Sequence, residues 1–248
     1  MWLIAEYEAT TLFSLKPATA TASGGRTLLV PTPFAVKMAL LDAACRLEGQ
    51  AVAAELWEAW LAGLTVALAP PPRVVVNNTF IKVRKRWEFK GKKAEKEAAQ
   101  EKAKKQRRYP FGSSISYREY AQWEGRLGIA LGEVTTEQAD WLIPWLAQIN
   151  YLGKRGSFVQ LQAPPALHEA LPEGYLAVGE ALEMMPVDAL LTQLDDVGAK
   201  VSFAHVNVYD KKRLRLGKER VLHHVALPYR LVASSRGYSY YALSEETP

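Results

Sequence analysis

The chain is organised around residues Lys82 to Arg108, which read KVRKRWEFKGKKAEKEAAQEKAKKQRR and lie between two strand-like segments. This basic stretch holds 13 Lys and Arg against 4 Glu, whereas the whole chain of 248 residues holds 31 against 26 acidic residues. The other 221 residues therefore carry 18 basic and 22 acidic side chains, a net charge of −4 beside +9. Because the positive charge is gathered in one place, the sequence predicts a segment that contacts a polyanion, RNA or DNA.

Two interpretations of the basic stretch remain open. Residues 94–106 have high helix propensity but no apolar stripe, so they cannot pack on a core. The stretch is either a solvated insertion in a hairpin loop, helical or disordered, or an arm that orders on nucleic acid. Aromatic side chains interleave its cations and favour base stacking together with phosphate contact: Trp87, Phe89, Tyr109 and Phe111. We favour the arm.

The segments on either side of the basic stretch alternate between strand and helix patterns. Thr32 and Pro33 are a typical helix N-cap and first position, and they predict a helix that ends at Gly49. The other predicted elements are strands at 2–13, 64–68 and 73–83, a helix at 51–62, a hairpin at 114–131, a helix at 137–150 and a strand at 159–162. This β-α-β-β-α-β order is typical of a ferredoxin-like or RRM-like domain.

The fold class that follows is α+β, with a ferredoxin-like domain at residues 1–162 and a smaller β-rich portion at 163–248. In that second portion, residues 201–209 and 221–233 are the clearest strand patterns, and a basic loop at 210–220 is expected to join them as a hairpin. Adjacent Asp195 and Asp196 are isolated in the sequence and are expected to cap a turn.

Composition excludes several other classes of protein. The chain is 49% apolar and 23% charged, as globular proteins are, so general disorder is excluded. Cys45 is the only cysteine, and no Cys/His cluster has zinc-site spacing, so neither an internal disulfide nor a metal or other cofactor is expected. We expect no signal peptide, because acidic residues follow the first few residues at once, and no membrane span. The expected location is the cytoplasm.

Two smaller basic clusters lie outside the stretch. The loop at 210–220 carries Lys211, Lys212 and Arg213, and on its own it would be a solvated turn. Residues 151–157 read YLGKRGS, in which glycines flank Lys154 and Arg155 and would let a backbone approach a phosphate. A glycine and lysine after a helix also form an ordinary C-cap, so both interpretations of this turn stay open.

Three segments, in this order, resemble the Cas-five family, the repeat-associated (RAMP) subunits of type I CRISPR surveillance complexes. Residues 29–41 (LVPTPFAVKMALL) resemble the Pro-rich turn and first helix of that family. Residues 149–157 (INYLGKRGS) resemble its leucine-glycine-lysine turn, and residues 225–232 (VALPYRLV) resemble its C-terminal strand. The basic stretch is longer and richer in Lys than the corresponding segment of the family, and residues near the C-terminus do not identify a subtype.

The resemblance implies a RAMP subunit of a Cascade assembly, active in antiviral defence, that caps the 5′ handle of the CRISPR guide RNA (crRNA). The family's inserted thumb would fall on residues 78–113. Expected partners are the crRNA, the backbone and large subunits, and target DNA through the complex, with no membrane and no small-molecule substrate. The expected RNA contacts are Lys82, Arg84, Lys85, Arg86, Lys104, Lys105, Arg107, Arg108, Lys154 and Arg155, then Lys211, Lys212 and Arg213, and last Lys37 and Arg46 on the polar side of the first helix.

Some members of the family are metal-independent endoribonucleases, so catalysis has to be weighed. A base that removes the proton of a 2′-hydroxyl needs a pKa near neutrality, which points to histidine. The four histidines available are His168, His205, His223 and His224. The grouping of Tyr, Lys and His found in the processing members has no match at the corresponding positions. We therefore expect no catalytic residues. The alternatives are a repeat-processing endoribonuclease and a housekeeping RNA-binding protein.

Overall fold

The structure is a computed structural model that describes residues 1–20, 25–179 and 188–244. Its helices are α1 (Pro33–Leu47), α2 (Gln50–Ala59), the 3-10 turn η1 (Leu61–Gly63), α3 (Lys93–Lys105), α4 (Thr136–Ala147) and α5 (Phe203–Val206). Its strands are β1 (Trp2–Ala9), β2 (Thr65–Ala69), β3 (Arg73–Arg86), β4 (Phe111–Glu124), β5 (Leu127–Gly132), β6 (Val159–Leu161), β7 (Ala166–His168), β8 (Leu176–Ala177), β9 (Leu190–Val197), β10 (Arg220–Leu227), β11 (Tyr229–Ser234) and β12 (Tyr238–Leu243).

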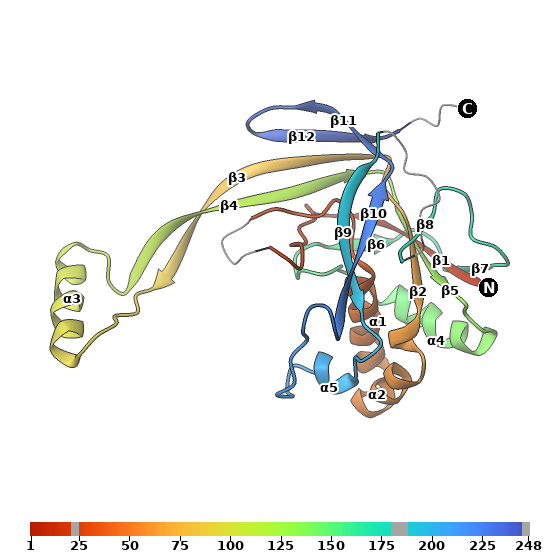
Figure 1. The fold of residues 1–248 in the computed structure, drawn as a ribbon, viewed down its shortest axis with the longest axis horizontal. Helices are drawn as coiled ribbons and strands as arrows, with labels where there is room; N and C mark the ends of the chain where they lie inside the picture. Colours follow the sequence, from red (N-terminus) through yellow and green to blue (C-terminus); the bar gives the residue numbers. More distant parts are fainter. Residues whose placement is uncertain (21–24, 180–187, 245–248) are drawn as a thin grey trace.

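A central antiparallel sheet defines the fold. Its strand order is β6-β1-β5-β2-β8, and β7 pairs with the opposite end of β1 from β6. The first four strands of that order, with α1 and α2 after β1 and α4 after β5, give the ferredoxin-like (RRM-like) topology, so the predicted α+β fold class is confirmed. Figure 1 shows α1, α2 and α4 together on one side of this sheet.

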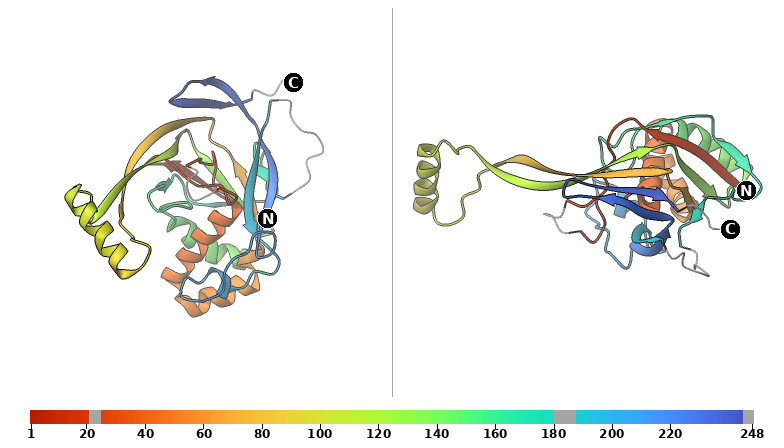
Figure 2. Two further views of the ribbon diagram at one scale, coloured as in Figure 1. Left: turned by 60° about the vertical axis from the view of Figure 1, so that its left-hand side comes forward. Right: turned by 90° about the horizontal axis from the view of Figure 1, so that it is seen from above.

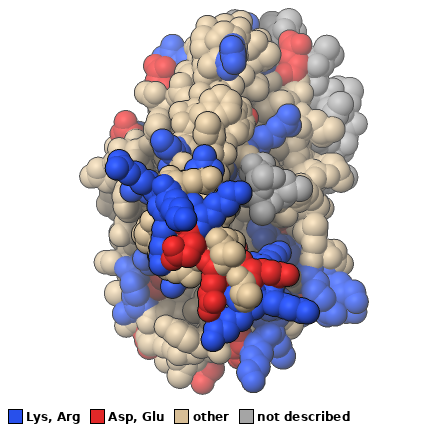
Figure 3. All heavy atoms as spheres, turned by 90° about the vertical axis from the view of Figure 1, so that its left-hand side faces the viewer, with Lys and Arg blue, Asp and Glu red and all other residues tan. Residues whose placement is uncertain are grey.

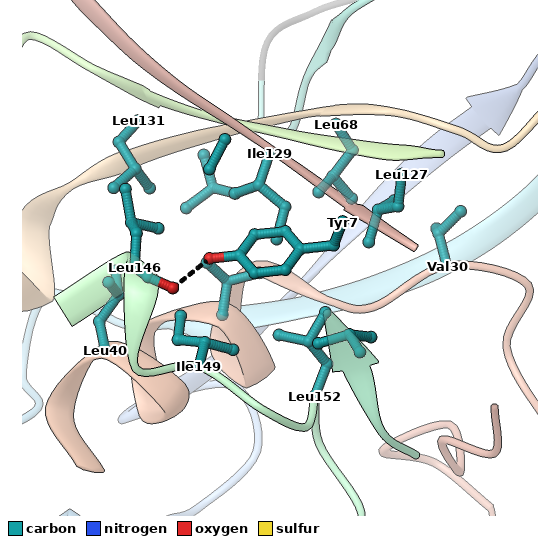
Figure 4. Close-up of a cluster of buried hydrophobic side chains, with 14 of the residues drawn as sticks. Tyr7, Val30, Leu40, Leu68, Leu127, Ile129, Leu131, Leu146, Ile149 and Leu152 are labelled. Atoms are coloured by element: carbon teal, nitrogen blue, oxygen red, sulfur yellow. Dashed lines mark hydrogen bonds between the residues drawn. The ribbon is translucent and has the colours of Figure 1, made fainter. Parts of the chain in front are cut away.

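The main core lies between the sheet and these helices. Tyr7 of β1 is fully buried there, and its hydroxyl donates a hydrogen bond of 2.7 Å to the carbonyl oxygen of Leu146 in α4 (Figure 4). Burial also raises the pKa of the Tyr7 hydroxyl far above its usual value, so the hydroxyl keeps its proton. The close-up shows Leu68, Ile129 and other buried side chains around the same ring, and the hydrogen bond to Leu146 ties β1 to α4.

A long β-hairpin leaves the body of the molecule. Strands β3 and β4 pair in register from Arg73↔Glu124 to Arg86↔Phe111, but the next strand, β12, reaches β3 only as far as Asn77. Beyond Asn77 the hairpin is therefore a two-stranded ribbon, and α3 sits at its tip. Figures 1 and 2 show ribbon and helix projecting away from the body. Residues 93–105 of the basic stretch are helical and lie between two paired strands, and we call residues 78–113 the thumb. Whether the thumb is an arm that orders on nucleic acid stays a prediction.

Two predictions for the second half of the chain are wrong. Residues 201–209 form the short helix α5 with turns, and the strand that pairs with β10 is β9, in the register His223↔Leu194. Locally, Ser202 favours the helix because its backbone N–H and hydroxyl both lie within hydrogen-bond distance of the His205 Nδ1, at 3.1 and 2.8 Å. The predicted strand at 221–233 is divided into β10 and β11 at Pro228, which has no N–H to donate.

The C-terminal strands complete other sheets. Strands β11 and β12 extend the hairpin into a sheet of order β11-β12-β3-β4, while β9 and β10 pair only with each other. Strands from residues 1–162 and from 163–248 thus share sheets, and the division into two portions at this point stays a prediction. Among the described residues, no helix combines the length and apolar character needed to cross a bilayer.

Candidate nucleic-acid interface

One face of the thumb ribbon combines cations with aromatic and apolar side chains. On β3 this face carries Phe80, Lys82, Arg84 and Arg86, because alternate residues of a strand share a face. The residues directly opposite on β4, which share the same face, are Tyr117, Ile115, Ser113 and Phe111. Phe80 is 69% exposed and Ile115 is 75% exposed, so the face is open to a ligand. The side chain of Lys85 lies outside the described part of the structure.

At the tip, this face runs into a cavity of about 620 Å³ between the ribbon and the loop that follows α3. We call this cavity the thumb cleft. Its lining holds four cations and three aromatic rings but no acidic residue, and it consists of Lys82, Arg84, Trp87, Arg107, Arg108, Tyr109, Pro110, Phe111, Gly112 and Ser113. The cleft thus gathers four of the predicted contacts from both ends of the basic stretch.

Aromatic rings form a stack beside the cleft. The rings of Trp87 and Phe89 are 5.8 Å apart with planes 17° from parallel, and Phe89 stacks in turn on Tyr109 at 6.4 Å. The ammonium of Lys104 lies 5.8 Å from the centre of the Tyr109 ring. Trp87 and Tyr109 are each 38% exposed, so part of this stack is accessible to the planar face of a base.

The turn after α3 brings the two arginines of the cleft into place. The backbone N–H of Arg107 donates to the Lys104 carbonyl, and that of Arg108 donates to the Ala103 carbonyl, both at 2.9 Å. These two hydrogen bonds form a Schellman motif, in which the first residue after the C-cap adopts the left-handed conformation and is usually glycine. Here that residue is Arg107, with φ 52°. The left-handed conformation costs a residue other than glycine about 1–2 kcal/mol. Sequence patterns did not reveal this turn, because no glycine marks it.

The outer surface of α3 is charged but mixed in sign. Glu95 caps its start by accepting the Lys92 N–H at 2.9 Å, and Lys104 pairs with Glu101 at 3.1 Å in the last turns. Figure 3 looks onto this end of the molecule and shows blue Lys and Arg side chains gathered around a smaller red group. Lys104 and Lys105 are exposed, but neither lines the thumb cleft.

The Lys154–Arg155 turn lies beside the root of the thumb. Gly153 and Gly156 have φ values of 71° and 104°, so the tight turn needs both glycines. The ammonium of Lys154 is 5.9 Å from the centre of the Tyr120 ring on β4, and Arg155 is exposed. This turn is a second basic cluster, and it lies near the end of β4 that joins the body, not at the tip of the thumb.

The third basic cluster lies in the exposed loop between α5 and β10 and consists of Lys211, Lys212 and Arg213. This loop does not join two strands, so the predicted hairpin tip is wrong. Arg215 and Glu219 fix the loop with hydrogen bonds of 2.6 and 3.1 Å between guanidinium and carboxylate, and they lower the pKa of Glu219 to about 2. The three cations precede this pair in the loop and are exposed.

The prediction that Lys37 and Arg46 lie on the polar side of the first helix is wrong for Lys37. The Lys37 side chain is 3% exposed, and its ammonium lies 2.8 Å from a carboxylate oxygen of Asp196. Desolvation lowers the pKa of Lys37, and the attraction of Asp196 opposes that shift. Arg46 is partly exposed and is held by Asp42, at 3.0 Å, and by the carbonyl oxygen of Gln148. Lys37 is thus unavailable to a ligand on the surface.

The expectation for Asp195 and Asp196 is also wrong, because both lie within β9 and each has a basic partner. Asp195 is buried and accepts from Arg220 of β10, while Asp196 pairs with Lys37 of α1. Residues far apart in the sequence thus satisfy two carboxylates that looked isolated.

The histidines are scattered over the body. His168 is exposed on β7, and His205 is bonded to Ser202. His224 lies 2.9 Å from the amide nitrogen of Gln193, while His223 points to the other face of β10. Within the described residues, no histidine lines the thumb cleft and no group of His, Cys, Asp and Glu has the arrangement of a metal site.

Comparison with known proteins finds similarity among solved structures only. No protein-family model matches the chain, and no curated protein matches it. Among solved structures, the chain is similar to one described as a CRISPR protein from Archaeoglobus fulgidus, with 12% sequence identity and a TM-score of 0.42. The match covers 99% of this chain and 93% of that one.

Proposed function

We propose that this protein is a non-catalytic RNA-binding subunit of a type I CRISPR interference complex, and that its thumb holds the guide RNA. The observation that carries the proposal is the thumb cleft, where four cations and an aromatic stack meet with no acidic residue in the lining. The resemblance of three sequence segments to the Cas-five family supplies the guide RNA as the ligand and its 5′ handle as the part that is bound.

The chemistry of the cleft favours a single strand. Lys82, Arg84, Arg107 and Arg108 can neutralise successive phosphates, which releases counterions and drives binding. Trp87 and Tyr109 offer partly exposed ring faces on which unpaired bases can stack, and a duplex does not expose its base faces. Phosphate contact and stacking together are the two parts of single-strand recognition. The Lys154–Arg155 turn would then hold the strand where it reaches the body.

A binding role is favoured over cleavage of RNA. The lining of the thumb cleft includes Lys and Arg but no histidine, whereas removal of a 2′-hydroxyl proton needs a base whose pKa lies near neutrality. The described histidines lie on β7, α5 and β10 instead. The projecting form of the thumb also suits an assembly, in which it would reach the adjacent backbone subunit, while the body would contact the large subunit.

Binding of single-stranded RNA is expected to depend steeply on salt. If about six phosphates are neutralised, the slope of log affinity against log salt concentration is expected near −4. Fluorescence anisotropy of a labelled single-stranded RNA, titrated at several salt concentrations, measures this slope. A slope near zero would contradict phosphate contact by the thumb.

The RNA that copurifies with the protein tests the CRISPR assignment separately. We expect sequencing of this RNA from the native host to return guide RNAs with a common 5′ handle. Incubation with repeat RNA in EDTA is expected to leave that RNA intact. Cleavage that is lost on substitution of one histidine would instead favour the endoribonuclease, and copurified ribosomal RNA would favour a housekeeping role.

A further inference from the structure

The thumb receives little support from the rest of its own chain. Within the described residues, Ala103 is the only buried side chain of α3. A helix of 13 residues without tertiary contacts is only marginally stable in water. On the ribbon, Phe80 is 69% exposed and Ile115 is 75% exposed on the same face, and exposed apolar side chains that lie together mark interaction surfaces. The thumb is therefore a surface that a partner can cover.

The helix side of the body has the opposite charge. Residues 33–63 and 133–148, which include α1, α2 and α4, hold seven acidic residues and only two basic ones, Lys37 and Arg46. Lys37 is buried and paired with Asp196, so it does not neutralise the surface. We call the outer side of these three helices the acidic helix face. Its exposed carboxylates belong to Asp42, Glu55, Glu58, Glu133, Glu137 and Asp140.

The thumb and the acidic helix face are complementary. The basic stretch carries a net charge of +9, while Glu55, Glu137 and Asp140 form no salt bridge with any described residue. Both surfaces also expose apolar side chains, which on the helices are Leu47 and Val52. One exposed ion pair contributes little, but several of them around apolar contacts are typical of a protein interface. A second copy of this chain therefore offers each surface a partner.

The shape of the molecule allows both contacts to form at once. Figure 1 shows α3 and the helices α1 and α2 on the same side of the ribbon, one at the tip and the others at the body. A two-fold axis between them would place each thumb against the helices of the other copy. We propose that, without RNA, two copies of this chain pair in this way, with each thumb on the acidic helix face of its partner. Such a reciprocal contact closes at two copies.

Sedimentation velocity of the full chain, freed of nucleic acid, tests the pairing. At about 0.05 M salt we expect a monomer–dimer equilibrium with a Kd of about 10 μM or below. At about 0.5 M salt the dimer is expected to weaken at least tenfold, because screening removes most of the attraction between exposed charges.

Two charge-reversal variants make the test specific. The thumb variant exchanges Lys93, Lys96 and Lys102 for Glu, and the helix variant exchanges Glu55, Glu137 and Asp140 for Lys. All six residues are exposed, and none lines the thumb cleft. Each variant alone is expected to stay monomeric at about 100 μM, tenfold above the expected Kd, because like charges meet at both contacts. An equimolar mixture is expected to form dimers again, since each contact of a mixed pair joins opposite charges.

The matched control exchanges Glu8, Glu169 and Glu173 for Lys, which makes the same charge change at exposed positions outside the helices. We expect this control to pair as the unchanged chain does. A monomeric unchanged chain at about 100 μM, an equal loss of pairing in the control, or a mixture of cooperatively folded variants that stays monomeric would overturn the proposal. Growth past the dimer would overturn it too, because a contact that is not reciprocal does not close.

Single-stranded RNA is expected to dissociate the pair, because strand and partner would use the same cations of the thumb. This expectation rests on the proposed function, whereas the pairing itself is measured without RNA. A pair that persists with RNA bound would overturn the competition. Failure to bind RNA would contradict the proposed function and leave the pairing intact.

Discussion

Exchange of Lys82, Arg84, Arg107 and Arg108 for Glu is expected to weaken binding of single-stranded RNA on the order of 10³-fold at about 0.1 M salt. All four side chains line the thumb cleft, so the variant removes its positive charge at one place. Each phosphate contact to a single strand contributes about 0.7 to the salt slope, so the slope is expected to fall by about 3. Anisotropy with a labelled RNA across salt concentrations gives both quantities.

The matched control moves the same charge change to another part of the thumb. Exchange of Lys92, Lys93, Lys96 and Lys102 for Glu alters four exposed lysines on and before α3, none of which lines the thumb cleft. We expect this control to lose about tenfold or less, because only the general attraction of the thumb is reduced. Equal losses in the two variants would show that net charge, and not the cleft, holds the strand.

Arg107 allows folding and binding to be separated at a single position. Its φ of 52° suits glycine, so Arg107→Gly is expected to relieve strain at the end of α3 while it removes one cation from the cleft. A protein whose helix end is as stable as before, or more so, should then bind RNA about fivefold more weakly at about 0.1 M salt. Hydrogen exchange of α3 amides measures the first effect. Unchanged affinity would remove Arg107 from the binding site.

Local sequence rules predicted the elements that short-range contacts determine. Thr32 accepts the Ala35 N–H at 3.1 Å and Pro33 opens α1, as their residue types indicate. Thr135 likewise caps α4 through Gln138. The thumb was predicted because its charge and its lack of an apolar stripe show in the sequence without knowledge of any partner.

Long-range contacts account for what the sequence did not reveal. Lys37 was assigned to the surface because lysine is rarely buried, and its partner Asp196 lies 159 positions away. The predicted strand at 201–209 fails because the partner available to β10 is β9, whose sequence LLTQLDDV gives only a weak alternation. The thumb cleft likewise needs the turn at Arg107, which depends on where α3 ends.

Removal of the buried ammonium of Lys37 is expected to have the largest effect on stability. In Lys37→Ala the carboxylate of Asp196, which is 14% exposed, would lose its partner while it stays in a desolvated site. Breaking a buried pair from one side costs about 3–5 kcal/mol, since the remaining charge is uncompensated. The contact joins α1 to β9, so unfolding is expected to begin with release of the β9–β10 sheet from the helices.

Urea denaturation followed by tryptophan fluorescence measures this loss, and two further variants make it specific. Arg46→Ala, on the same helix, breaks a pair with Asp42 whose side chains are 42% and 47% exposed, together with a hydrogen bond to the Gln148 carbonyl. Because these contacts are exposed, the substitution should cost only about 1–2 kcal/mol. Lys37→Met combined with Asp196→Asn removes both charges and keeps an acceptor for the Val197 N–H, which Asp196 now binds at 2.7 Å. Because no unpaired charge remains, most of the stability should return. A loss in Lys37→Ala no greater than that in Arg46→Ala would mean that water reaches Asp196, and that the pair does not fasten β9 to α1.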